Sequence, residues 1–166
     1  MAKVFSVFNG PGPTTAAPAA VATSAAVKTM IQFSTSASSE ARVVEWWWEG
    51  DGSAAATPGT IELMFHSTGA ATVTAYVLAT DVKKYDPNSR ASLITVGTAN
   101  SGYSASAEGT PATALGSIVH KVPPTSGIYI QYPLGREPEV PISSFARVRN
   151  TLAVGVNAIC GLAWEE

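Results

Sequence analysis

The chain has 166 residues, enough for one domain that buries roughly two thirds of the surface its unfolded form exposes. Charged residues make up 13% of it, about half the usual share of roughly 25%, and the formal net charge is −2. The only adjacent basic pair is Lys83-Lys84, so we expect no nucleic-acid partner, because phosphate neutralisation needs a basic patch. No apolar run approaches the roughly 18 residues of a membrane-spanning helix, so we expect no membrane partner. So few surface charges predict that part of the surface is covered in an assembly.

The first 26 residues differ in composition from the rest. Residues 4–27 carry no charge, and Pro11, Pro13 and Pro18 interrupt a stretch rich in Gly, Thr and Ala. Such a stretch has too few large apolar side chains to order by itself. We therefore predict an extended arm over residues 1–26 and a β-sandwich domain over residues 27–166. The apolar run at residues 4–8 is too short for a signal peptide, so we expect synthesis in a cytoplasm without export by that route.

From residue 27 onward, apolar side chains recur at every second position, which is the period of a β-strand. Strands are predicted at residues 27–33, 41–49, 59–65, 72–78, 92–96, 116–122 and 127–132. The longest alternation, from Leu152 to Trp164, has an apolar residue at every even position and predicts one long half-buried strand. Turn-forming residues separate these segments, and none has the apolar spacing of an ordinary helix. The pattern predicts an all-β antiparallel β-sandwich, with jelly-roll topology favoured over an immunoglobulin-like one.

Three consecutive tryptophans, 46 to 48, lie in the predicted strand 41–49. Side chains alternate between the two faces of a strand, so an inward-facing set of Val44, Trp46 and Trp48 places Trp47 on the other face. An indole there requires cover from a second sheet, from a loop of the same chain or from another molecule. The candidate interface combines this indole with apolar residues of the arm: Trp47, Phe5, Phe8, Pro11 and Pro13.

Residues suited to metal binding or nucleophilic chemistry are few. His66 and His120 have no partner at a metal-ligand spacing, which favours hydrogen-bonded or surface roles over a zinc ligand or general base. Cys160, the only cysteine, is expected to be a buried inert thiol. Asp81 and Asp86 lie near turns, which favours backbone capping over a calcium site.

Paired carboxylates of the glycosidase type are also not expected. Glu45 and Glu49 share a strand face, but a separation of four residues places them about 13 Å apart. Catalytic carboxylate pairs are separated by roughly 5 to 9.5 Å. The chain also has no Gly-x-Ser-x-Gly elbow. We therefore expect a protein that is not an enzyme and has no cofactor or metal.

A further set of short segments is spread over the chain: residues 41–46, 51–58, 61–63, 85–88, 109–110, 122–124, 132–138 and 164–166. Together they resemble a small virion protein encoded by tailed phages of actinobacteria. The similarity extends over nearly the whole chain, arm included, and contains no catalytic signature. It implies a β-sandwich decoration (cement) protein on the capsid surface of the virion. Its implied partners are the major capsid protein and further copies of itself, with a homotrimer favoured.

Two other functions share the same composition. One is a carbohydrate-binding β-sandwich in a tail or receptor-binding context, with Trp47 and either Tyr103 or Tyr129 as a stacking platform. The other is a structural tail protein, which is equally rich in β-strands and poor in charge.

Overall fold

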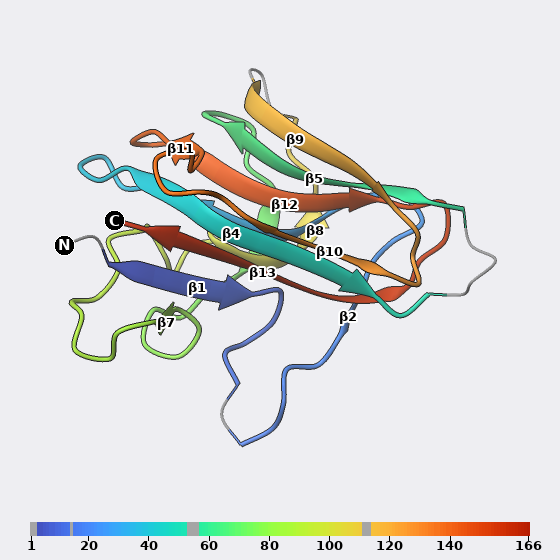
Figure 1. The fold of residues 1–166 in the computed structure, drawn as a ribbon, viewed down its shortest axis with the longest axis horizontal. Coiled ribbons are helices and arrows are strands. Elements are labelled where there is room, and N and C mark those ends of the chain that lie inside the picture. Colours follow the sequence, from blue (N-terminus) through green and yellow to red (C-terminus); the bar gives the residue numbers. More distant parts are fainter. Residues whose placement is uncertain (1–2, 14, 53–56, 111–113) are drawn as a thin grey trace.

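The computed structural model describes residues 3–13, 15–52, 57–110 and 114–166 as two antiparallel sheets packed face to face (Figure 1). These residues contain no helix, so none of them forms a helix able to cross a membrane. The predicted all-β sandwich is confirmed. The preference for a jelly roll over an immunoglobulin-like topology stays a prediction.

Sheet A has the strand order β10-β4-β13-β1-β7, so β10 and β7 form its two edges. Its strands are β1 (Val4–Phe8), β4 (Ala41–Gly50), β7 (Lys83–Lys84), β10 (Gly127–Gln131) and β13 (Asn157–Glu165). Two further short strands join it: β2 (Val21–Ala22) pairs with β13, and β11 (Glu139–Val140) pairs with β4.

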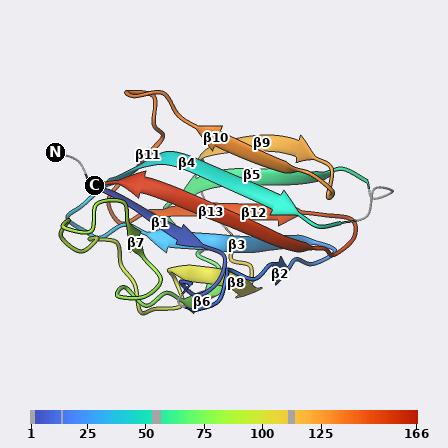
Figure 2. The same cartoon turned by 60° about the horizontal axis from the view of Figure 1, so that its bottom comes forward.

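Sheet B has the strand order β6-β8-β3-β12-β5-β9. Its strands are β3 (Val27–Ser34), β5 (Gly59–His66), β6 (Thr72–Ala75), β8 (Gly102–Ala107), β9 (Ala114–Val122) and β12 (Phe145–Thr151). Figure 2 shows this sheet behind sheet A, with β12 running between β3 and β5. Predicted strand 92–96 is not formed; it contributes one bridge, from Thr95 to Ser34.

Aromatic side chains from both sheets fill the core. Trp46, Trp48 and Trp164 are fully buried. The Trp164 ring stacks on Phe33 of sheet B at 4.8 Å between ring centroids and on Phe5 of sheet A at 6.0 Å. Such offset ring pairs add to the hydrophobic gain from burial, so this three-ring stack ties the two sheets together.

The inward-facing residues of β4 confirm the predicted parity of the tryptophans but not of the valine. Trp46 and Trp48 are buried, and Trp47 lies on the opposite face. A bulge interrupts the pairing with β13, because Ala163 faces Glu45 whereas Trp164 faces Val43. One extra residue shifts the alternation, so Val43 and not Val44 enters the core.

The predicted arm is wrong at its beginning. Residues 4–8 form β1, which lies between β13 and β7, and Phe5 and Val7 are fully buried. The alternation of apolar side chains in this short run is enough to complete sheet A once two strands flank it. The segment without regular pairing is therefore shorter. Its described residues, 9–13 and 15–20, belong to the loop that leaves the sandwich between β1 and β2 (Figure 1).

The long C-terminal alternation is also wrong over its first half. β12 ends at Thr151 and β13 begins at Asn157, so the residues between them form the connection, with Val154 58% exposed. Ala158, Cys160, Leu162 and Trp164 keep the predicted inward positions. The alternation of apolar residues in the sequence continues through this connection, so it did not mark where β13 begins.

Candidate binding face

An aromatic row crosses four strands on the outer face of sheet A. The register pairs Phe8 of β1 with Gly161 of β13, Gly161 with Trp47 of β4, and Trp47 with Tyr129 of β10. Paired residues on adjacent antiparallel strands point to the same face. The neighbours of Trp47 along β4 are buried, so this face is the one turned away from the core. We call Phe8, Trp47 and Tyr129 the aromatic row.

The indole of Trp47 is the centre of the row. Its ring lies 5.8 Å from Phe8 at an interplanar angle of 74° and 6.3 Å from Tyr129 at 34°. A side-chain carbon on Gly161 would lie 1.9 Å from Cζ2 of the indole, so only glycine leaves room for the ring there. Trp47 and Phe8 are half-buried and Tyr129 is 60% exposed. Neighbouring rings thus fix the indole while one face of the row stays open to solvent.

Glu45 lies beside the row and binds two tyrosines. The Tyr129 hydroxyl donates to Glu45 Oε2 at 2.5 Å, and the Tyr85 hydroxyl donates to Glu45 Oε1. The hydrogen bond to Glu45 raises the pKa of Tyr129, and burial followed by the same carboxylate raises the pKa of Tyr85. Both hydroxyls therefore remain protonated donors at neutral pH and hold the carboxylate in one place.

The loop after β1 continues the row. Phe8, Pro11 and Pro13 line a shallow cavity of about 250 Å³ under this loop. Asn9 anchors the loop by donating from Nδ2 to the Ala158 carbonyl at 2.8 Å. Three of the predicted interface residues besides Trp47 therefore lie next to one another at one end of the row.

Phe5, the remaining predicted interface residue, is in the core and is a wrong prediction. It is fully buried and stacks on Trp164. Within β1 it shares the inward parity of Val7, whereas Phe8 has the outward parity.

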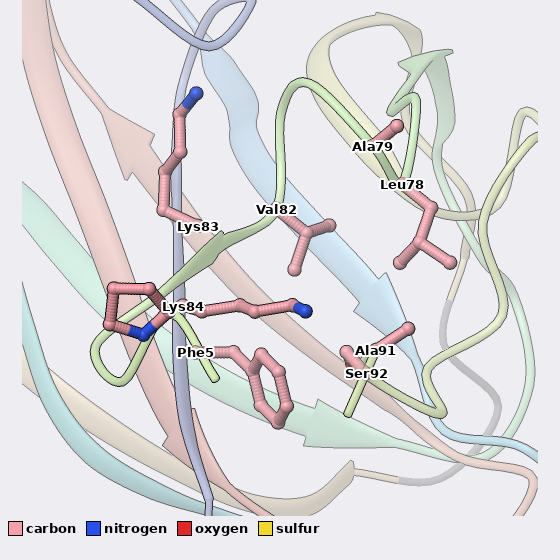
Figure 3. A pocket seen from close by; sticks show the side chains of 9 residues that line it. Phe5, Leu78, Ala79, Val82, Lys83, Lys84, Ala91 and Ser92 are labelled. Carbon is pink, nitrogen blue, oxygen red and sulfur yellow. The ribbon is translucent and has the colours of Figure 1, made fainter. Parts of the chain in front are cut away.

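A second concavity lies at the β7 edge of sheet A. Its volume is about 510 Å³, its walls are mostly apolar, and Phe5 lies at its floor. The residues that line it are Phe5, Leu78, Ala79, Val82, Lys83, Lys84, Pro87, Ala91 and Ser92 (Figure 3). The register between β1 and β7 pairs Lys84 with the inward-facing Phe5, so the Lys84 side chain lies on the inner face of sheet A and lines this cavity. We call it the edge cavity.

The two histidines do not form a common site. His120 pairs with Ile61 on β5, and His66 lies five residues further along that strand, which corresponds to about 17 Å. His66 is fully buried, stacks on Phe145 and has Nδ1 2.8 Å from the Thr68 carbonyl. Burial, followed by the positive charge of Arg147, lowers the pKa of His66 to about 4.

The aspartates bind backbone groups, as predicted. Asp81 accepts hydrogen bonds from the Val77 and Gly12 amides at 2.7 and 2.8 Å, so it also holds the loop after β1. Asp86 accepts from the Asn88 amide at 3.0 Å. Within the described residues no three His, Cys, Asp or Glu side chains gather as metal ligands. Cys160 is fully buried, and burial raises the pKa of its thiol, which keeps it protonated.

Sequence reasoning identified Trp47 and Tyr129 but not the residues that fix them. Neither Gly161 nor Tyr85 was among the predicted interface residues. Tyr103, the other predicted platform residue, is on β8 of sheet B, where it lies 5.5 Å from the ring of Tyr76. The shared face of Glu45 and Trp47 was the one available signal, since both lie at odd positions of β4.

Comparisons with protein-family models, with curated proteins and with solved structures gave no significant match. The site itself therefore carries the functional argument. In this site rigid rings present flat apolar area beside one fixed carboxylate.

Proposed function

We propose that this protein is a structural binding protein that docks on a protein shell through the outer face of sheet A, in the role of a capsid decoration protein. The observation that carries the proposal is the aromatic row, with Trp47 fixed between Phe8 and Tyr129 and partly open to solvent. The sequence resemblance to virion proteins of tailed phages supports the choice of a capsid as the shell.

The row has the properties of an interface hot spot. Trp and Tyr bury large area at low cost in side-chain entropy, and Trp47 is already held in one orientation by Gly161 and Phe8. Glu45 is held by the two tyrosines, so a partner meets an ordered acceptor and not a mobile charge. Each docking contact of this size is weak, but many copies on one shell bind multivalently.

The test is occupancy of purified heads by variants that remain folded. We expect Tyr129→Ala and Trp47→Ala to melt cooperatively with losses of about 1 to 2 kcal/mol or less. We expect both to reduce head occupancy at least about tenfold, as for loss of a hot spot. Val119→Ala is the matched control, because Val119 is an exposed residue on β9 of sheet B, away from the row. It should bind as the parent does.

Two results would contradict the proposal. One is unchanged occupancy in both row variants while each is folded. The other is location of the protein on the tail and not on the head by labelled electron microscopy of virions.

Carbohydrate binding is a second candidate, favoured by one observation. Trp47 and Tyr129 are inclined by 34° and lie beside Glu45, so a sugar ring could stack on the indole while its hydroxyls meet an acceptor. Glycan-array binding that Trp47→Ala abolishes, together with unchanged head occupancy, would assign the row to sugar and not to the shell.

A further inference from the structure

The connection between β10 and β11 presents one leucine almost entirely to solvent. Leu134 is 94% exposed, the highest value among the large apolar residues that the structure describes. The turn around it is held by the Arg136 amide on the Pro133 carbonyl at 2.9 Å and by the Gly135 amide on Glu137 Oε2 at 2.7 Å. Gly135 has φ of +81°, a conformation that glycine adopts without strain. Leu134 is therefore an ordered apolar projection. The residues that follow it carry one positive charge, at Arg136, and two negative charges, at Glu137 and Glu139, so the segment is acidic by one charge.

The edge cavity has the complementary properties. It has about 510 Å³ of mostly apolar space, ample for a leucine and part of its turn. The Lys84 side chain extends across it, whereas Lys83 points away (Figure 3). Lys84 Nζ donates to the Ser89 carbonyl at 2.6 Å, which uses one of its three donors. Among the described residues no carboxylate forms an ion pair with Lys84.

The projection and the cavity lie on opposite edges of the same sheet, at the same level along its strands. Tyr132, two residues before Leu134, bonds to the carbonyl of Val44. The pairing continues from Val43 to Trp164, from Trp164 to Phe5 and from Phe5 to Lys84. Figure 2 shows the β10–β11 connection at one edge and β7 at the other. Both features therefore lie at the end of the sandwich where the backbones of Lys3 and Glu166 pair (Figure 1).

We propose that a second copy of this chain occupies the edge cavity, with Leu134 of one copy inserted between Val82 and Ala91 of the next. The acidic residues that follow Leu134 then approach the Lys84 ammonium, so apolar and charge complementarity act together. The two surfaces are different, so the contact is head-to-tail. An open chain of copies therefore keeps one free projection at one end and one free cavity at the other until a ring closes. This self-contact does not depend on the proposed docking of the aromatic row.

Complementation between two variants tests the geometry. Leu134→Asp removes the projection and leaves the cavity, whereas Ala91→Trp fills the cavity and leaves the projection. We expect each variant alone to sediment as a monomer at concentrations where the parent forms larger species. A mixture of the two should form 1:1 dimers and nothing larger, because only one pair of matching surfaces remains. Val154→Asp, at an exposed valine of the β12–β13 connection, is the control and should associate as the parent does.

A charge reversal tests the polar half of the contact. Lys84→Glu should weaken association at least about tenfold, since it places an anion opposite Glu137 and Glu139. Lys121→Glu changes net charge equally but lies exposed on β9 of sheet B and does not line the edge cavity, so it should have little effect.

The proposal is overturned if the parent stays monomeric at all concentrations, if the mixture forms no dimer, or if Leu134→Asp associates as the parent does. Loss of head occupancy in Leu134→Asp without any change in self-association would assign the turn to the shell and also overturn it. Because all association measurements use free protein, their failure leaves the docking proposal standing.

Discussion

At the scale of single residues, buried side chains decide stability and half-buried ones decide contact. Trp164 touches both sheets, since its ring stacks on Phe33 and on Phe5 and its Nε1 donates to Glu166 at 2.9 Å. Trp47 has the same side chain but the opposite parity, and it packs on other surface rings. The same side chain therefore packs in the core at one position and on the outer face at the other.

Trp164→Ala should lower the free energy of unfolding by about 3 to 5 kcal/mol, because it removes the largest ring of the inter-sheet stack and leaves a cavity. Urea titration of both proteins measures the difference. Val154→Ala is the matched control, since Val154 shares the even-numbered alternation but is exposed, and it should change stability by less than about 0.5 kcal/mol. A loss below about 1 kcal/mol for Trp164→Ala would show that the stack does not join the sheets.

His66 should make stability fall as pH falls from about 6.5 to about 4. Its pKa is lowered to about 4 in the folded protein, first by burial and then by Arg147, from an ordinary value of 6.5. Between these values the unfolded chain binds a proton that the folded chain does not, so acid favours unfolding. With allowance for solvent screening, we expect about 1 to 2 kcal/mol.

The measurement is a series of urea titrations across that pH range on the parent and on His66→Gln. The variant has no titratable group at position 66 and keeps all the others, so the difference in stability between the two proteins should shrink as pH falls. A difference that stays constant with pH would show that His66 is protonated equally in both states.

At the scale of elements, β12 shows how a polar strand occupies the middle of a sheet. Arg147 is fully buried. Its Nε donates to Gln32 Oε1 at 3.0 Å, and its Nη2 donates to the Gly69 carbonyl at 2.8 Å. Its Nη1 forms an ion pair with Glu108 Oε2 at 3.5 Å. Its partners come from three separate segments. A buried cation left without them would cost several kcal/mol, so β12 fits only when these segments are in place.

The loop after β1 is an exposed element that we expect proteases to reach. Hydrogen bonds of Asn9 and Gly12 anchor its start. Its end is anchored by Thr23, whose Oγ1 donates to the Val156 carbonyl at 2.9 Å. Residues 15–20, between these anchors, are exposed. Limited proteolysis of free protein should cut first within residues 13–20, and docking on a shell should slow this cut. Mass spectrometry of the fragments identifies the site. First cleavage elsewhere, or equal rates in free and bound protein, would contradict this prediction.

At the scale of the whole molecule, the two proposed contacts occupy different parts of sheet A. The aromatic row crosses the middle of the outer face, from β1 to β10, whereas the self-contact uses the two edges. Copies joined edge to edge would hold their outer faces in a common orientation, so neighbouring rows could contact one shell together. Such an arrangement would raise the overall affinity of the copies for the shell and would cover part of the charge-poor surface of each copy.

The sequence by itself determined the fold class, the main strands and the parity of the tryptophans. These follow from a period of two, which depends only on the geometry of one strand. It also placed Trp47 outside the core, next to Glu45.

Only the tertiary structure decided which strands are neighbours, and the errors follow from that. Residues 4–8 are too short a run to be recognised as a strand, but pairing with β13 on one side and β7 on the other makes them part of the core. β12 was missed because Arg147 is polar, and its burial depends on Glu108 and Gln32 from distant segments. The aromatic row and the edge cavity likewise exist only through register across strands, which is a long-range property that no local pattern in the chain contains.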